Sequence, residues 1–328
     1  MARYYIGSSI SENRIWFGIF EKLGEPLTIW SVPTLKRRGC RAVLSEMADE
    51  IHKKLAEFRV LSGDAAGIGV SVPAEVGKTG ILDYCEELGW GIVNIEVVLS
   101  GLSGFRVRAG SSRDMAVLGE HWAMGTDAPE NMVCLLAGNE LRGGIIVNNS
   151  LILDKDGRSG DLGKILVAAP LHGDDSVQGT MLRETSSFRN MLKRYGDCVE
   201  YLGKTASVQN MHVTAACDMV NAALDGDPLC NKILDASASD IAMALYNIKC
   251  TVCIEKVVIG GEDELGCRII ADKIAGFYRN IARGNDCELK IEASVLGKKA
   301  EVYGSARYVL ISEGNSPDGE DRRREKIC

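Results

Sequence analysis

The spacing of apolar residues changes between strand-like and helix-like along the first third of the chain. Residues 4–8 and 14–20 are rich in β-branched and aromatic side chains, and the polar residues 11–13 lie between them. This pattern predicts two strands joined by a turn. The apolar run 66–73 ends in a proline, which predicts a buried strand. Within residues 40–58 one helix face is predicted by the spacing of Val43, Met47, Ile51 and Leu55.

The middle of the chain predicts a helix and a strand pair. Near Ser112 we expect a loop to pass into a helix over residues 115–122. The apolar runs 133–137 and 144–148 predict two strands joined by the loop 138–143. Residues 170–190 are polar and irregular, so we expect an insertion or a surface loop there.

The last third predicts a helix over 240–248, a strand over 257–259 that ends in Gly260 and Gly261, and a helix over about 266–282. Residues 313–328 are charged and show no periodicity. We therefore expect a mobile tail at this end.

Composition narrows the class of protein. A chain of 328 residues usually forms more than one core, so two lobes are expected. The formal net charge of −7, with no basic block before the last few residues, argues against a nucleic-acid partner. No apolar run approaches the roughly 20 residues that span a bilayer. The N-terminus shows no signal-peptide layout, so we predict a cytoplasmic protein without a membrane partner.

The 11 cysteines are scattered along the chain. Without a secretory signal they are expected to be free thiols in a reducing cytosol, several of them buried. Cys250 and Cys253 form a C-x-x-C at the start of a strand-like run, but no second pair stands at zinc spacing. We interpret this pair as a structural coincidence.

Glycine-bearing turns recur after the first strand, in mid-chain and at Gly260-Gly261. Such turns place backbone N–H groups around phosphate oxygens, because glycine permits close approach. In their order and spacing, over roughly residues 4–311, the chain resembles the ROK family of bacterial sugar kinases and sugar-responsive repressors. The resemblance rests on Ile6 to Asn13 at the family's Gly-x-Asp-x-Gly-Gly-Thr loop, Gly67 to Pro73, Leu88-Gly89-Trp90, Leu118-Gly119-Glu120, Gly143 to Asn148, Ser159 to Gly163 at Gly-Glu-x-Gly-His, Gly196 to Glu200 at Gly-Cys-Leu-Glu, Val258 to Gly261, and Gly304-Ser305-Ala306.

This resemblance implies the two-lobed actin-like ATPase fold of sugar kinases, an α/β architecture with a ligand cleft between the lobes. We expect an N-terminal lobe over 1–112 with a returning helix at 298–312, a C-terminal lobe over 113–297, and the tail 313–328. The resemblance also implies a homodimer. Family repressors carry an N-terminal helix-turn-helix domain, whereas this chain opens directly on its first strand, so direct control of DNA is not expected.

The chain departs from the family at the position of the catalytic base. In active members an Asn-Asp pair supplies a sugar contact and the general base, and a match without gaps places Ser111 and Ser112 there. A serine hydroxyl does not take a proton from a sugar hydroxyl near neutral pH, and a positioned base contributes roughly 10²–10⁴ in rate. Asp114 is a weak substitute, because aspartate in a first helical turn is ordinarily explained by the helix dipole.

Both phosphate loops are altered as well. The family's first-loop Asp, which helps to hold magnesium, is Ser9 here, and the following Gly-Gly-Thr is Ser11-Glu12-Asn13. The second loop contains Gly138, Asn139, Glu140 and Gly143. Two glutamates, Glu12 and Glu140, are therefore expected to point into loops that face a triphosphate in the family. Like charges about 4 Å apart cost on the order of 4 kcal/mol at an effective dielectric near 20. Whether Arg142 neutralises Glu140 is left open by the sequence.

The resemblance assigns sugar contacts to Asp161, Lys164 and Glu200, together with Ser111 and Ser112. Lys164 replaces a histidine, and either meets an anion such as a sugar phosphate or pairs with Asp161. Active relatives hold zinc with one His and three Cys, and the matching positions here are Lys164, Met191, Lys193 and Cys198. Lysine and methionine do not build a structural zinc site, so we predict that the zinc site is lost and that no metal is bound.

Three functions follow as hypotheses. The first is a catalytically impaired ROK protein that binds a sugar, sugar phosphate or nucleotide in a regulatory role. The second is an atypical but active sugar kinase that uses ATP with magnesium. In this case Ser9, Glu12, Asn13, Gly138, Asn139, Gly143, Gly260 and Gly261 are expected to line the nucleotide site. The third is a scaffolding or dimerisation protein with a vestigial pocket.

Overall fold

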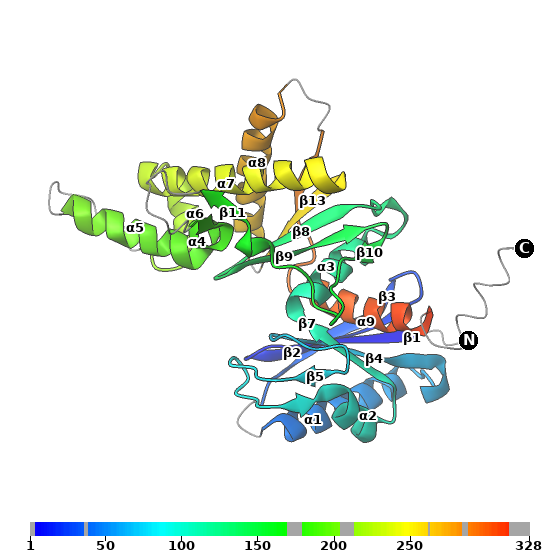
Figure 1. Ribbon diagram of the computed structural model, residues 1–328. Helices are drawn as coiled ribbons and strands as arrows, with labels where there is room; N and C mark the ends of the chain where they lie inside the picture. The colour runs from blue at the N-terminus through cyan, green and yellow to red at the C-terminus, as the bar shows by residue number, and fades with distance from the viewer. Residues whose placement is uncertain are drawn as a thin grey trace, which may run out of the picture. The chain divides into compact units, whose positions relative to one another are not determined.

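The computed structural model describes residues 4–35, 39–168, 179–203, 213–261, 263–283 and 288–314. Contacts between Cα atoms divide the chain into two compact units, coloured along the chain in Figure 1. Unit 1 contains residues 1–128, 153–159 and 298–328, and unit 2 contains residues 129–152 and 160–297. This division differs from the boundary expected at residue 112, because 113–128 and 153–159 group with unit 1.

Unit 1 is built on a five-stranded sheet in the order β3-β2-β1-β4-β7. The strands are β1 (Tyr4–Ile10), β2 (Arg14–Glu21), β3 (Pro26–Pro33), β4 (Ala65–Val72) and β7 (Val107–Ser111). β1 is antiparallel to β2 and parallel to β4, and β4 is parallel to β7. Because β1, β4 and β7 run parallel to one another, their carboxyl ends lie at the same edge of the sheet, where polar residues of the opening motif lie.

Alternating side chains of this sheet enter two different cores. Ile6 packs with the helices α1 (Cys40–Glu57) and α2 (Ile95–Ser103), whereas its neighbour Tyr5 packs with α9 (Lys299–Gly314). Successive strand residues point to opposite faces, so the sheet is covered on both sides. In Figure 1, α1 and α2 lie on one side of this sheet and α9 on the other. A short pair, β5 (Ile81–Leu82) and β6 (Val93–Asn94), and the turns η2 (Ser62–Asp64) and η3 (Gly125–Asp127) complete the unit.

Close contact between α3 (Ser112–Ala123) and α9 explains two segments of the family resemblance. A Cβ atom added at Gly304 would lie 1.6 Å from the carbonyl oxygen of Met115, and one at Gly119 would lie 1.8 Å from that of Ala300. Both distances are far below van der Waals contact, so only glycine lets the two backbones approach this closely. Gly119 and Gly304, in Leu118-Gly119-Glu120 and Gly304-Ser305-Ala306, are therefore explained by helix packing.

Unit 2 has a second five-stranded sheet, in the order β10-β9-β8-β13-β14. Its strands are β8 (Met132–Ala137), β9 (Leu141–Val147), β10 (Ser150–Leu151), β13 (Lys256–Gly260) and β14 (Lys290–Ala293). The helices α4 (Leu182–Ser186), α5 (Phe188–Gly203), α6 (Ala216–Leu224), α7 (Pro228–Val252) and α8 (Glu264–Ile281) supply most of one apolar core with β8, β9 and β13. The short elements are η4 (Leu162–Lys164), β11 (Leu166–Ala168) and β12 (Thr180–Met181).

Two expected boundaries in unit 2 were wrong. The loop expected over 138–143 contains only residues 138–140, because β9 already begins at Leu141, which pairs with Ala137 and is buried. Residues 251 and 252 are helical, not strand-like: α7 continues to Val252, and Cys253 ends it with a left-handed φ of 54°. The β-branched residues at the end of α7 resembled a strand in the sequence alone.

Two expected irregular regions were also partly wrong. Residues 180–190 contain β12, α4 and the start of α5, because Leu182 and Phe188 are buried in the core and Glu184 caps α4 through Met181 N at 2.8 Å. Residue 179 is in neither a helix nor a strand, and the remainder of that expected loop, 170–178, lies outside the described residues. Glu313 and Gly314 belong to α9, and the rest of the expected tail lies outside the described residues.

None of the cysteines that the structure describes forms a disulfide. Cys85, Cys134, Cys230 and Cys267 are buried, and Cys217, Cys250 and Cys253 are exposed. Burial raises the pKa of the Cys230 thiol to about 12. None of the described helices is both long and apolar enough to cross a bilayer.

Candidate functional site

The position of the catalytic base lies at the junction of β7 and α3 in unit 1. Ser111 ends the strand and caps the helix, because its Oγ accepts a hydrogen bond from the backbone N–H of Asp114 at 3.2 Å. Ser112 is the first residue of α3 and is half-buried. The hydroxyl of Ser111 is thus occupied in ending the strand and starting the helix.

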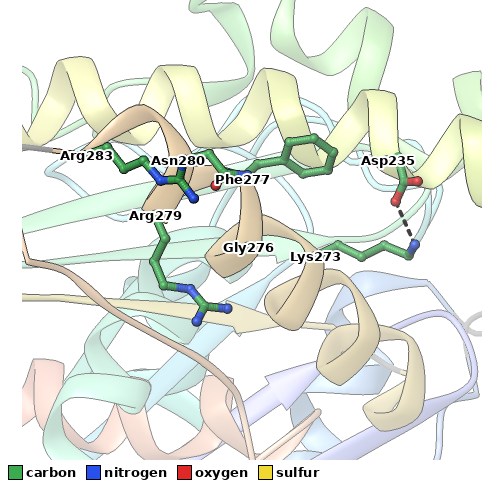
Figure 2. Close-up of a pocket in the computed structure, with 7 residues that line it drawn as sticks. All are labelled: Asp235, Lys273, Gly276, Phe277, Arg279, Asn280 and Arg283. Carbon is green, nitrogen blue, oxygen red and sulfur yellow. Dashed lines mark hydrogen bonds and ion pairs between the residues drawn. The ribbon is translucent and has the colours of Figure 1, made fainter.

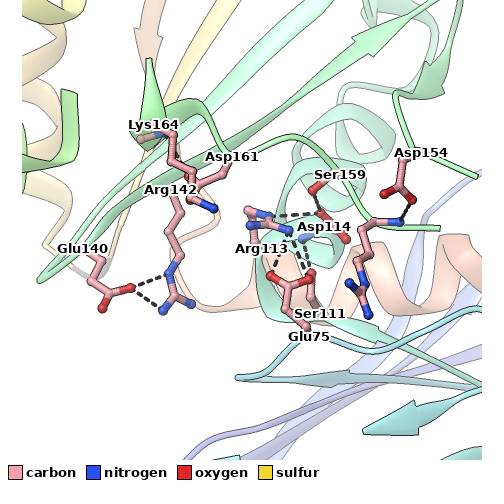
Figure 3. A network of polar contacts seen from close by, with 12 residues as sticks. Glu75, Ser111, Arg113, Asp114, Glu140, Arg142, Asp154, Ser159, Asp161 and Lys164 are labelled. Carbon is pink, nitrogen blue, oxygen red and sulfur yellow. Dashed lines mark hydrogen bonds and ion pairs between the residues drawn. The ribbon is translucent and has the colours of Figure 1, made fainter. Parts of the chain in front are cut away.

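Asp114 is buried in the first turn of α3, with 7% of its surface exposed. Its Oδ1 accepts hydrogen bonds from the hydroxyl of Ser159 and from Arg113 Nε at 3.3 Å. Arg113 is equally buried and makes a second ion pair, from Nη2 to Oε1 of Glu75 at 3.1 Å. Figure 3 shows Arg113 and Ser159 against the Asp114 carboxylate, and Arg113 also against Glu75. Asp114 is held by its neighbours, and it also favours the positive end of the helix.

The first loop, Ser11 to Asn13, is a tight turn closed by its own hydrogen bonds. Ser11 N donates to Arg14 O at 3.0 Å, and the carbonyl oxygen of Asn13 accepts from Thr34 N at 3.0 Å. Glu12 is exposed, and its backbone N–H donates to Oε1 of Glu87 at 2.9 Å. The backbone groups of this turn are therefore engaged within unit 1.

Ser9 lies next to a carboxylate that the sequence did not point to. Its Oγ donates to Oε2 of Glu301 at 2.6 Å, and Ser71 Oγ donates to the same oxygen at 2.7 Å. Burial raises the pKa of Glu301, although the hydrogen bonds from Ser9 and Ser71 act in the opposite direction. Glu301 is distant in sequence from both serines, so no local motif could have identified it.

The second loop, in unit 2, is the turn Gly138-Asn139-Glu140 between β8 and β9. Arg142 Nε donates to Oε2 of Glu140 at 2.9 Å, and Arg189 Nη1 lies 3.7 Å from Oε1 of Glu140. Figure 3 shows the hydrogen bonds between Arg142 and Glu140. The hydrogen bond from Arg142 lowers the pKa of Glu140. The question that the sequence left open is settled: Glu140 is ion-paired, so its charge is compensated.

Two glycines expected to face phosphates have a structural reason to be glycine. A Cβ at Gly143 would lie 2.4 Å from the carbonyl oxygen of Cys134, and one at Gly261 would lie 2.5 Å from that of Ala137. Gly260 ends β13 and is buried, whereas Asn139 is exposed in the turn. Sheet packing alone accounts for these glycines, so their presence does not by itself indicate a phosphate site.

The expected sugar contacts of unit 2 are only partly brought together. Asp161 caps η4 by accepting from Gly163 N at 3.0 Å, and its Oδ2 lies 3.8 Å from both Lys164 Nζ and Arg183 Nη1. Lys164 thus pairs loosely with Asp161, and its side chain is 60% exposed. Glu200 is exposed on α5. Arg183 was missed in the sequence, because only the fold places α4 beside η4.

Zinc and magnesium fit these residues differently. At the expected zinc positions, Lys164 and Lys193 are exposed and Met191 is buried in the core of unit 2, so this donor set does not fit zinc. Magnesium takes carboxylate and hydroxyl oxygens, which Glu301 and its serines offer. Among the described residues, no group of three or more His, Cys, Asp or Glu side chains could hold a metal. A magnesium ion would therefore need further ligands from a bound molecule such as a phosphate.

A cavity of about 560 Å³ lies in unit 2 between α7 and α8. Its polar lining includes the ion pair of Lys273 Nζ with Asp235 Oδ1 at 2.6 Å, and Arg279 and Arg283 (Figure 2). None of the site residues predicted from the sequence lines it.

Comparisons with known proteins agree with this architecture. The fold is the actin-like ATPase fold of sugar kinases. In this fold the protein is similar to the ROK hexokinase of Thermus thermophilus, with a TM-score of 0.75 and 19% identity over 95% of this chain and 100% of that one. It also resembles a Streptomyces griseus ROK glucokinase solved with glucose and AMPPNP (TM-score 0.66, 20% identity, 93% and 98%). The glucokinase of Halalkalibacterium halodurans is 26% identical over 97% of this chain and 98% of its own length. The ROK family profile matches residues 31–311, and this chain belongs to the ROK family.

Proposed function

We propose that this protein binds a sugar, or a sugar phosphate, in a regulatory role and transfers phosphate far more slowly than an ordinary sugar kinase. The observation that supports this most directly is the start of α3. Ser111 and Ser112 occupy the positions of the family's Asn-Asp pair, and the Ser111 hydroxyl is used as the helix cap. A hydroxyl group cannot act as a general base near neutral pH.

The nearest acid of α3 does not replace the base in this proposal. The carboxylate of Asp114 accepts from Ser159 and from the buried Arg113. A sugar hydroxyl that approaches Oδ1 would have to displace these donors, and hydrogen bonds to a carboxylate of this kind are worth about 1.5–3 kcal/mol each. Asp114 therefore acts as an anchor between α3 and residues 153–159.

The groups proposed to meet the sugar are Ser111 and Ser112 in unit 1, and Asp161, Lys164 and Glu200 in unit 2. Arg183 joins them, because it shares the Asp161 carboxylate with Lys164. Two cations around one carboxylate favour a ligand with an anionic group, such as a sugar phosphate. The glucokinase relative makes glucose the first sugar to test. The homodimer and the cytoplasmic location stay predictions.

An active kinase is the second candidate function. Near full-length similarity to a glucokinase favours it, and so does the compensation of Glu140 by two arginines, which removes one source of repulsion against a triphosphate. In this case Asp114 would be the only carboxylate of α3's first turn able to serve as base.

Two measurements on the same preparation separate these functions. Calorimetric titration with glucose, other hexoses and their phosphates measures binding, and coupled ADP release with magnesium ATP measures turnover. We expect binding of at least one ligand, with turnover well below about 1 s⁻¹. Turnover of about 1 s⁻¹ or more that Asp114→Asn abolishes would establish the active kinase, and the exposed Asp127→Asn is the matched control. No binding across the panel would favour the scaffolding hypothesis.

A further inference from the structure

A carboxylate from the end of the chain lies beside the first motif loop. Glu301, in the first turn of α9, accepts hydrogen bonds from Ser9 Oγ at 2.6 Å and Ser71 Oγ at 2.7 Å. Ser9 and Ser71 are direct partners in the register of β1 and β4. Their side chains consequently leave the sheet on the same side and reach the same carboxylate oxygen.

The packing of α9 against the sheet fixes this arrangement. A Cβ at Gly7 would lie 2.0 Å from Val302 O, and one at Gly69 would lie 1.9 Å from Ser305 O, so α9 can approach β1 and β4 only over glycine. Ser305 Oγ also accepts from Ser8 N and donates to Ser8 O, both at 3.0 Å. These contacts set the register of α9 along the strands, and they place Glu301 one turn before Ser305.

Only one oxygen of the Glu301 carboxylate accepts these hydrogen bonds. Both serines donate to Oε2, and Oε1 accepts no hydrogen bond from the residues that the structure describes. Glu301 as a whole residue is half-buried. If the residue served only to join α9 to the sheet, a neutral glutamine oxygen would do so without the cost of burying a charge. A carboxylate with one oxygen outside these two hydrogen bonds, oriented by two hydroxyls, has instead the form of a cation ligand.

We propose that Glu301 supplies the carboxylate for the magnesium ion of a bound magnesium nucleotide, in place of the acid that Ser9 lacks. Magnesium is usually held by one or two protein carboxylates together with phosphate oxygens and water, so a single glutamate is sufficient. Ser9 and Ser71 orient this glutamate. The inference goes beyond the proposed sugar binding, because it requires neither a general base nor phosphate transfer.

The test is the effect of magnesium on the affinity for AMPPNP, measured by calorimetric titration with MgCl₂ and with EDTA. Metal and nucleotide should strengthen each other's binding in the wild type by roughly tenfold, within the usual range of coupling between ligands. Glu301→Gln keeps the shape and an acceptor for both serines, and it should remove this coupling while metal-free nucleotide binds as before. Glu313→Gln is the matched control: it lies on the same helix and accepts a hydroxyl hydrogen bond from Tyr5 at 2.9 Å, and it should leave the coupling intact.

A second variant separates ligation from structure. The double variant Ser9→Asp with Glu301→Gln has its carboxylate on β1 instead of α9. We expect magnesium to strengthen AMPPNP binding again in this variant. If Glu301→Gln lowers the midpoint of urea unfolding but leaves the magnesium effect unchanged, Glu301 is a structural residue and the proposal is wrong. It is also wrong if the wild type binds AMPPNP equally well with and without magnesium, or does not bind it. Sugar titrations of Glu301→Gln should match the wild type, so failure here does not depend on the proposed sugar binding.

Discussion

The two altered loops of this protein differ in the charged residues that lie next to the changed positions. In unit 1, an acid of the family motif has become Ser9, and a glutamate from a remote helix lies against that serine. In unit 2, a glycine-rich loop has gained Glu140, and Arg142 and Arg189 pair with the new charge. In one loop a charge is missing from its motif position, and in the other a charge is added and compensated.

This difference shows that a motif position does not by itself define the local electrostatics. The expected repulsion between Glu140 and a triphosphate assumed that the charge of Glu140 is uncompensated. Arg142 and Arg189 compensate that charge. The missing acid at Ser9 likewise does not mean a neutral neighbourhood. The start of α3 is different again, because the acid nearest to Ser112 is bound to Arg113 and Ser159.

The largest effect is expected from breaking the frame that positions the unit 1 loop. Gly304→Leu places side-chain atoms where Met115 O already lies 1.6 Å from a Cβ, so we expect a loss of more than about 3 kcal/mol in unfolding free energy, or no soluble protein. Gly276, in the middle of α8, has open space around its Cβ. Gly276→Ala is the control and should stabilise by roughly 0.5–1 kcal/mol. Equal stabilities of the two variants in urea would contradict the packing account.

The next effect concerns the acid of α3. Asp114→Asn weakens the contacts to Arg113 and Ser159, so the unfolding free energy should fall by about 2 kcal/mol. Ser159→Ala removes one of the same contacts and should cost about 1 kcal/mol. Urea unfolding of both variants tests whether Asp114 is an anchor. A fully stable Asp114→Asn protein would return this carboxylate to the list of candidate bases.

The smallest effect is expected in the compensated loop of unit 2. The arginines hold the pKa of Glu140 below its ordinary value, so its contribution to stability is present above that value and is lost as the pH falls through the lowered pKa. Because the side chain is 47% exposed, the contribution should stay within about 0.5 kcal/mol. Unfolding of wild type and Glu140→Gln between pH 7 and pH 3 should show a small difference that disappears at the acidic end. A difference that grows on acidification would have the wrong sign.

Much of the fold could be predicted from periodicity and turn residues, because long amphipathic and buried elements leave a local signal. The helix 40–58 and the strands around Ile6 and Val258 are of this kind. The end of α7 and the helices near Leu182 could not be placed, since Thr251 and Val252 are β-branched, which favours a strand, and the residues around Leu182 are mostly polar, which favours a loop. The framework glycines were recognised as family segments, but their reason, contact between distant backbones, is visible only in three dimensions.

The site was predictable only where its residues are near each other in sequence. Ser111, Ser112 and Asp114 were identified because they precede Leu118-Gly119-Glu120. The pair of Glu140 and Arg142 could be suspected, because opposite charges lie only two residues apart in the sequence. Glu301 and Arg183 could not be found, because each meets its partners through packing between distant segments.

The most direct test of the account is to restore the missing base. Ser112 begins α3, where aspartate is favoured by the helix dipole, so Ser111→Asn combined with Ser112→Asp should fold. The measurement is ADP release from magnesium ATP with the sugar that the wild type binds. The account predicts an increase of roughly 10²–10⁴ over the wild type, the usual contribution of a general base. An unchanged rate in this variant, beside a wild-type rate that depends on Asp114, would contradict it.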